Sequence, residues 1–276
     1  MSNPTVNYIP FLYLLTLLAY GALSVIFLRA QLAGNAEALN RGIWGNAVLL
    51  PLALHGYLLY DNLWIAGTLN LGLVQALSLI LGLTILVYWL AHFFYPLASL
   101  KALVLPLAGA GAMLPLLFPS ERVVPHATSW TFDAHVLAAM LAYSLFTIAA
   151  LHAALMSLVE SNLHRARLPA LLRNLPPLLT METLLFRIIA AGFVLLSLTL
   201  ISGSIFSEQI FGRVWQFNHK ILFGFISWGV FGVLLAGHHF YGWRGRKAVS
   251  WTMSGFGFLV LAYIGSKFVL EVILQR

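Results

Sequence analysis

Long apolar runs are the feature of this sequence that most limits its possible folds. Polar or Pro/Gly-rich breaks divide the chain into eight apolar stretches, each near the roughly 20 residues that a helix needs to span a bilayer. Of 276 residues, 61% are hydrophobic and 8% charged, whereas a soluble domain carries about 25% charged residues. We therefore expect an all-α, polytopic membrane bundle of about eight transmembrane helices, forming a single integral-membrane domain over residues 1–276. The expected helices are Tyr8–Leu28, Ile43–Tyr60, Leu69–Tyr88, Leu100–Phe118, His135–Leu158, Leu184–Phe206, Ile221–Phe240 and Trp251–Leu274.

The distribution of basic residues predicts how these helices are oriented. If the N-terminus lies outside, ten Lys and Arg residues fall in the inner connections and four in the outer ones. Inner loops are the ones that membrane proteins enrich in basic residues, so we expect both termini outside. The longest inner connection, residues 160–183, places three arginines before the breaker Pro176-Pro177. This stretch is either a basic interfacial helix on the inner leaflet or a solvated linker.

The complete lack of cysteine narrows the chemistry further. It excludes thiolate ligands, iron–sulfur clusters and covalent haem attachment, so the nine histidines are the candidate ligands that remain. The sequence carries no Walker, HExxH or GxSxG motif, and we expect no enzymatic turnover. Because basic residues in a membrane protein mainly report orientation, the net charge of +7 does not predict a nucleic-acid partner. The lipid bilayer is the expected environment.

The predicted topology sorts the histidines into two layers. His55, His135 and His219 fall near the outer surface, whereas His92 and His238 fall near the inner surface. Neutral imidazoles from facing helices are a common way to hold the iron of a b-type haem. We expect His135 and His219 as outer ligands, His55 as an alternative ligand, and His238 with His92 as a second, inner site. A membrane histidine is also often only a hydrogen-bond partner between helices, and this alternative stays open.

Three further residues accompany the outer histidines. Lys267 lies inside the last expected helix, where an ionisable residue is a functional hypothesis by default. It would either face a haem propionate or pair with Glu271. Trp130 and Trp215 lie beside His135 and His219 in the sequence, and they would form either an interfacial aromatic belt or a flat apolar shelf for a porphyrin.

Several segments resemble one known family. They are NHKILFGFISWGVFGVLLAGHH from Asn218, GWRGRKAVSWTMSGFGFLVLAYIGSKFVLEVIL from Gly242, LALH at 52–55, LVLPLAG at 103–109, HVLAAMLAYSLFTIAALHAAL from His135 and LLSLTLISGSIF from Leu195. They resemble the cytochrome c assembly protein family, which includes CcsA and HemX, and within it the bacterial inner-membrane branch typified by YpjD. The resemblance implies a haem-handling protein of the bacterial inner (plasma) membrane, with a membrane or periplasmic protein partner.

The same resemblance assigns roles to individual residues. His135 matches the family's first outer histidine, His55 the histidine of the second helix, and His238 or His239 the histidine before the WRG turn. The family's tryptophan-rich segment is degraded here to Trp215-Gln216-Phe217-Asn218-His219-Lys220. The outer histidine expected after the last helix is missing, and His219 is the candidate to replace it.

Three functions follow from these patterns. The favoured one is a membrane protein that binds b-type haem through histidines near the outer face. The alternative is a non-catalytic scaffold or regulatory partner protein that keeps the fold without haem. A small-solute transporter ranks last, because Lys267 and Glu271 are the one candidate pair of intramembrane charges in the sequence.

Overall fold

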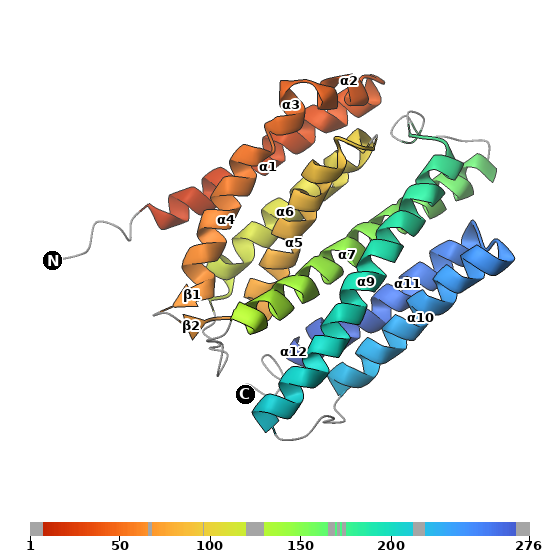
Figure 1. Ribbon diagram of the computed structural model, residues 1–276. Coiled ribbons are helices and arrows are strands. Elements are labelled where there is room, and N and C mark those ends of the chain that lie inside the picture. The colour runs from red at the N-terminus through yellow and green to blue at the C-terminus, as the bar shows by residue number, and fades with distance from the viewer. Residues whose placement is uncertain are drawn as a thin grey trace. The chain divides into compact units, whose positions relative to one another are not determined.

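The protein is a helical membrane bundle, as the apolar runs predict. The computed structural model describes residues 8–65, 68–95, 97–119, 130–164, 169, 172, 175–211 and 219–268. Within these ranges, eight helical segments are long and apolar enough to cross a membrane (Figure 1). This confirms the all-α fold with eight transmembrane helices, while the orientation of the termini stays a prediction. The helices fall into two compact units.

The first unit contains residues 1–125 and 169–175. Its membrane helices are α1 (Ile9–Leu32), α4 (Leu49–Leu63), α5 (Leu73–Ala91) and α6 (Ala98–Leu117), and a two-stranded hairpin, β1 (Trp64–Ile65) and β2 (Thr68–Leu69), follows α4. α1 and α5 each pack against both α4 and α6, which closes a four-helix arrangement. Gly109 and Gly111 allow α6 to approach its neighbours closely, since an added Cβ would lie 3.2 Å from Leu17 on α1 or 2.5 Å from Leu81 on α5.

The second apolar run is interrupted near its start. Two short helices, α2 (Ala36–Arg41) and α3 (Ile43–Asn46), precede α4. The buried Lys101 on α6 donates from Nζ to the carbonyl of Gly45 at 3.2 Å, and the Glu37 carboxylate accepts from the backbone N–H of Ala98 at 2.8 Å. The two bonds dock the α2–α3 segment onto the first turn of α6. The position of Glu37 is also electrostatically favourable, because an acidic group stabilises a helix N-terminus.

The second unit contains residues 126–168 and 176–276. Its helices are α7 (Trp130–His164), α9 (Leu178–Phe211), α10 (His219–Tyr241) and α11 (Arg246–Val260), the last continued by a π turn, η2 (Leu261–Gly265), and by α12 (Ser266–Phe268). α9 packs against α7 and α10, and α11 packs against the same two helices. In the core of this unit, the Phe146 and Phe231 rings stack with their centroids 3.9 Å apart.

Helices α7 and α9 are longer than the apolar runs predict. α7 begins at Trp130, so His135 lies more than one turn inside the helix and does not open it. α9 begins at Leu178, and its first turns include the end of the expected inner connection. The added turns contain polar residues, such as Asp133 in α7 and Glu182 in α9. A helix predicted from hydropathy ends where such residues begin, so both predicted helices are too short. Most of the connection between the two helices lies outside the described residues.

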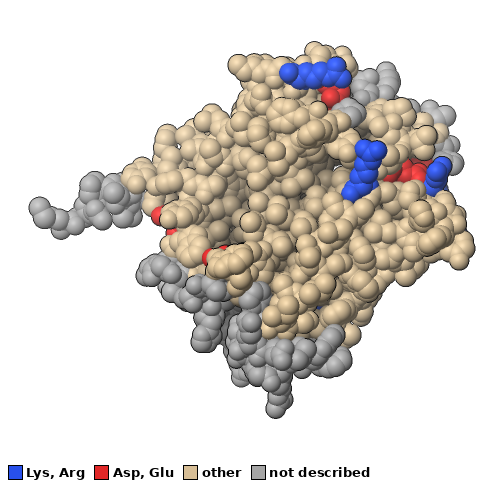
Figure 2. Space-filling view, in the orientation of Figure 1, with Lys and Arg blue, Asp and Glu red and all other residues tan. Residues whose placement is uncertain are grey.

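The described surface matches a protein surrounded by lipid. On the face shown in Figure 2, charged side chains are sparse and uncharged residues cover broad areas between them. Many large apolar side chains are exposed along the helices, among them Phe11, Leu18, Val194 and Ile201 at 53% or more. Such exposure is unfavourable in water and is the expected state in contact with acyl chains.

Candidate functional site

His135 is held by a hydrogen-bond chain that fixes which ring nitrogen carries the proton. Its Nδ1 lies 2.7 Å from the Ser202 hydroxyl oxygen, and that oxygen lies 2.7 Å from the carbonyl of Leu198. A carbonyl can only accept, so Ser202 donates to Leu198 and His135 donates from Nδ1 to Ser202. The neutral ring then has its lone pair on Nε2. Metal-ligating histidines commonly donate from their other nitrogen to a second residue, and the bond to Ser202 is compatible with such a role.

The surroundings of His135 come from one end of the second unit. Gly203 gives the ring room, because a Cβ there would lie 3.3 Å from His135 Cε1. His219 and Lys220 open α10 at this end, and both side chains are exposed. The Lys220 ammonium lies 5.1 Å from the centre of the Tyr263 ring. The structure therefore brings His135 and His219 to the same end of one helical unit, as their predicted depth requires.

Of the other outer candidates, one is exposed at the start of a helix, and the side chains of the other two are not described. Trp130 is the first residue of α7 and is 80% exposed. Trp215 lies outside the described residues. Lys267 belongs to α12, and its side chain is not among those described. The predicted roles of these three residues in binding a porphyrin remain predictions.

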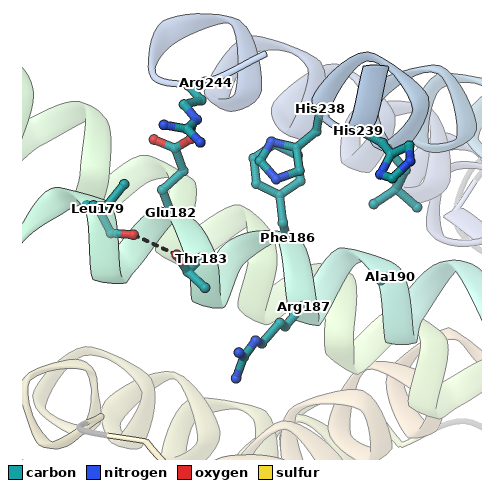
Figure 3. Close-up of a pocket in the computed structure, with 10 residues that line it drawn as sticks. Leu179, Glu182, Thr183, Phe186, Arg187, Ala190, His238, His239 and Arg244 are labelled. Carbon is teal, nitrogen blue, oxygen red and sulfur yellow. Dashed lines mark hydrogen bonds and ion pairs between the residues drawn. The ribbon is translucent and has the colours of Figure 1, made fainter. Parts of the chain in front are cut away.

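His238 lines a pocket at the opposite end of the same unit (Figure 3). The pocket has a volume of about 390 Å³ and is lined by Leu179, Glu182, Thr183, Phe186, Arg187, Ala190, Leu235, His238, His239 and Arg244. His238 donates from Nδ1 to the carbonyl of Trp243 at 3.0 Å, so the lone pair of its neutral ring also lies on Nε2. Its ring stacks on Phe186 with centroids 3.5 Å apart.

His55 has a different environment. It is 1% exposed and borders a pocket of about 340 Å³ whose other lining residues are mainly leucines. Its Nε2 lies 3.0 Å from the Ser78 hydroxyl and its Nδ1 lies 3.4 Å from the Tyr20 hydroxyl. Both ring nitrogens are thus engaged, and the histidine links α4 to α1 and α5. This geometry is typical of a structural histidine between helices.

His92 follows the last residue of α5 and makes mostly local contacts. Its Nδ1 contacts the carbonyl of Trp89, and its ring lies against Phe93 with centroids 4.0 Å apart. Partial burial lowers the pKa of His92, which favours the neutral ring. His92 belongs to the first unit and His238 to the second, and their predicted pairing remains a prediction.

Two residues that sequence reasoning did not single out define these sites. Ser202 carries no signal in the sequence that links it to a histidine, yet its hydroxyl lies 2.7 Å from His135 Nδ1. Glu182 is the second such residue, and it is only 9% exposed where it lines the His238 pocket. Its signal in the sequence is a carboxylate among apolar residues near the start of a membrane helix, where a charge is unfavourable without a partner.

In the described part of the chain, eight helices are long and apolar enough to cross a membrane and histidines lie at both ends of one four-helix unit, which defines a multi-pass membrane protein. Residues 44–274 match the family model for cytochrome c assembly protein, and the chain belongs to this family. The chain is 32% identical to the inner membrane protein YpjD of Escherichia coli K12 over 175 residues, which are 62% of this chain and 65% of YpjD. The aligned part therefore spans slightly under two thirds of that relative.

Two other relatives extend the comparison. An uncharacterized 28.8 kDa protein of Azospirillum brasilense is 29% identical over 88% of this chain and 91% of its own length. The cytochrome c biogenesis protein CcsA of Prochlorococcus marinus MIT 9515 is 36% identical over 32% of this chain and 28% of its own length. With its eight apolar helices, the chain is a multi-pass protein of the bacterial inner membrane.

Proposed function

We propose that this chain binds b-type haem non-covalently, with His135 as an axial ligand of the iron and His219 as the second candidate. The site lies at the end of the second unit that the basic residues assign to the outer face. The observation that carries the proposal is the hydrogen-bond chain from His135 through Ser202 to Leu198. This chain presets Nε2 as the ligating nitrogen, and histidine nitrogen is a common axial ligand of haem.

The residues at this end suit a haem in other respects. The chain has no cysteine, so attachment would rest on imidazole alone. Lys220 supplies a cation beside His219, at a position suited to an anionic propionate. Bound haem would supply an iron centre that changes between two oxidation states, while Ser202 would keep the His135 ring oriented. The name of the CcsA relative, a cytochrome c biogenesis protein, supports a role in haem handling with a membrane or periplasmic protein partner.

A second candidate function is a membrane scaffold or regulatory partner that does not bind haem. It is supported by His55, whose two nitrogens already have partners inside the first unit. Under this proposal, the histidines would mainly link helices. The two candidate functions differ in one directly measurable property, the affinity for haem.

The experiment is an absorption titration of the purified protein with haem. We expect a Soret band of histidine-ligated haem in the wild type, with loss of most of it in a variant that combines His135→Ala and His219→Ala. Tyr241→Ala is the control, because Tyr241 is an exposed ring side chain at the other end of the same unit and is not part of either histidine site. A wild type without a Soret band, or a band that depends only on His238, would contradict the proposed site.

A further inference from the structure

The pocket beside His238 contains a charged pair that haem ligation does not use. Glu182 Oε1 lies 3.6 Å from Arg244 Nε, which is longer than a good hydrogen bond. Among the residues that the structure describes, Glu182 Oε1 is buried and has no hydrogen-bond partner. A buried acceptor in this state is unfavourable, so the pocket favours a ligand that brings a hydrogen-bond donor.

Arg244 provides the complementary group at the edge of the pocket. Its side chain is 64% exposed, whereas that of Glu182 is 12% exposed, and Figure 3 shows the two side chains facing each other beside the pocket. A guanidinium has five N–H donors, and one long contact to Glu182 leaves donors for an anion. The pocket therefore places a buried acceptor and an exposed cationic donor side by side.

The remaining lining combines four apolar side chains with Thr183, Arg187 and the two histidines His238 and His239. Leu179, Phe186, Ala190 and Leu235 contribute apolar surface. The Thr183 hydroxyl donates to the carbonyl of Leu179 at 2.9 Å, so its oxygen is available only as an acceptor. The pocket lies where α10 ends and the basic turn 242–247 begins, the level at which a membrane helix meets the lipid headgroups.

We propose that this pocket binds an aminophospholipid, phosphatidylethanolamine being the lipid of matching chemistry. Its primary ammonium would donate to Glu182, its phosphate would accept from Arg244, and its acyl chain would lie along the apolar wall. Basic pockets between membrane helices are known sites for lipid headgroups. Glu182 sets the specificity. A quaternary choline headgroup has no N–H to donate, and a phosphatidylglycerol headgroup has no cation to balance the carboxylate. The carboxylate also disfavours the two anionic propionates of haem.

The test is a competition between three lipids with identical acyl chains. Delipidated protein in detergent is incubated with equal amounts of phosphatidylethanolamine, phosphatidylcholine and phosphatidylglycerol, and bound lipid is counted by native mass spectrometry. We expect the wild type to retain phosphatidylethanolamine preferentially. Glu182→Gln should reduce its preference over phosphatidylcholine roughly tenfold or more, because a hydrogen bond to a charged group is lost. Arg244→Gln should weaken binding of phosphatidylethanolamine and phosphatidylglycerol alike.

Glu160→Gln is the matched control, because Glu160 forms a comparable ion pair with Arg246 at 3.3 Å but does not line the pocket. It should keep the wild-type preference. Equal retention of the three lipids by the wild type, the same loss in Glu160→Gln, or displacement of phosphatidylethanolamine by haem through His238 would overturn the proposal. Arg244 is exposed, so Arg244→Gln gives a reading even if Glu182→Gln does not fold. The lipid measurement is separate from the Soret band that reports on His135.

Discussion

At the residue scale, the partners of each imidazole separate ligand candidates from structural histidines. His135 and His238 each donate from Nδ1 to an acceptor within the second unit, which leaves Nε2 as the basic nitrogen. His55 engages both nitrogens with hydroxyl groups. A buried histidine with two such bonds would have to lose one of them to bind iron. His55 thus links α4 to both neighbouring helices, whereas the role of His135 as an axial ligand is proposed from its bond to Ser202.

Ser202 offers a direct test of this difference. Ser202→Ala removes the acceptor of the His135 Nδ1–H, and loss of such a partner typically lowers metal affinity 10–100-fold. We expect haem affinity, measured by absorption titration, to fall by about that factor in Ser202→Ala. Ser204→Ala is the control, because Ser204 lies on the same helix and its hydroxyl donates to the carbonyl of Leu200 at 3.0 Å. Equal affinities of the two variants would argue against a positioning role for Ser202.

The sequence offers the histidines as candidates, but it does not predict which residues contact them. The predicted depth of His135 and His219 comes from counting residues along the apolar runs. In the structure, both residues lie at the same end of the second unit. The bond from His135 to Ser202 joins residues 67 apart in the chain, and its formation depends on how α7 packs against α9. The role of Glu182 could not be predicted for the same reason, since its contact with Arg244 joins α9 to the turn between α10 and α11.

At the scale of secondary-structure elements, glycine controls how closely the helices of the first unit approach. Gly111 on α6 faces Leu81 on α5 so closely that a Cβ would lie 2.5 Å from the nearest side-chain carbon and 3.0 Å from the Leu81 Cβ. Small residues at such contacts are the usual basis of helix association in membranes. A larger residue would have to push α6 and α5 apart.

Gly111→Ala should therefore destabilise the protein. Overpacking of a tight core contact costs typically about 1–3 kcal/mol, so we expect a lower thermal midpoint in detergent. Gly21→Ala is the control, because nothing lies within 4 Å of a Cβ added at Gly21 on α1, and it should leave the midpoint unchanged or slightly raised. An unchanged midpoint in Gly111→Ala would show that the α5–α6 contact is not tight.

Hydropathy predicts the existence of the eight membrane helices better than their ends. Each run is apolar because lipid surrounds it, and this signal is local in the sequence. The α2–α3 break was not predicted, since it depends on contacts of Glu37 and Lys101 between distant segments. The π turn at the end of α11 was also not predicted. Nearby, the Tyr143 hydroxyl of α7 donates to the carbonyl of Leu259 at 3.1 Å.

At the scale of the whole molecule, the predicted orientation decides which histidines face outward. The basic turn between α10 and α11 is tied to α9 and α7 by the ion pairs Arg244–Glu182 and Arg246–Glu160. The positive-inside rule assigns this end to the inner face. His135 and His219, at the other end of the unit, would then be accessible from outside.

Cysteine labelling tests this orientation, because the chain contains no cysteine of its own. In spheroplasts, a membrane-impermeant maleimide should label Lys220→Cys at the outer end of α10. Lys247→Cys, an exposed position in the first turn of α11, should react only after the membrane is permeabilised. The reverse pattern would invert the topology and place His135 on the inner side.

The central claim, that His135 ligates haem iron, is tested most directly by chemical rescue. His135→Gly removes the ligand and leaves space for free imidazole, whereas Tyr241→Gly removes an exposed ring at the other end of the unit. We predict that His135→Gly loses most of the wild-type Soret band and regains it when imidazole is added, while Tyr241→Gly keeps the band throughout. A wild-type spectrum in His135→Gly without imidazole would contradict the claim.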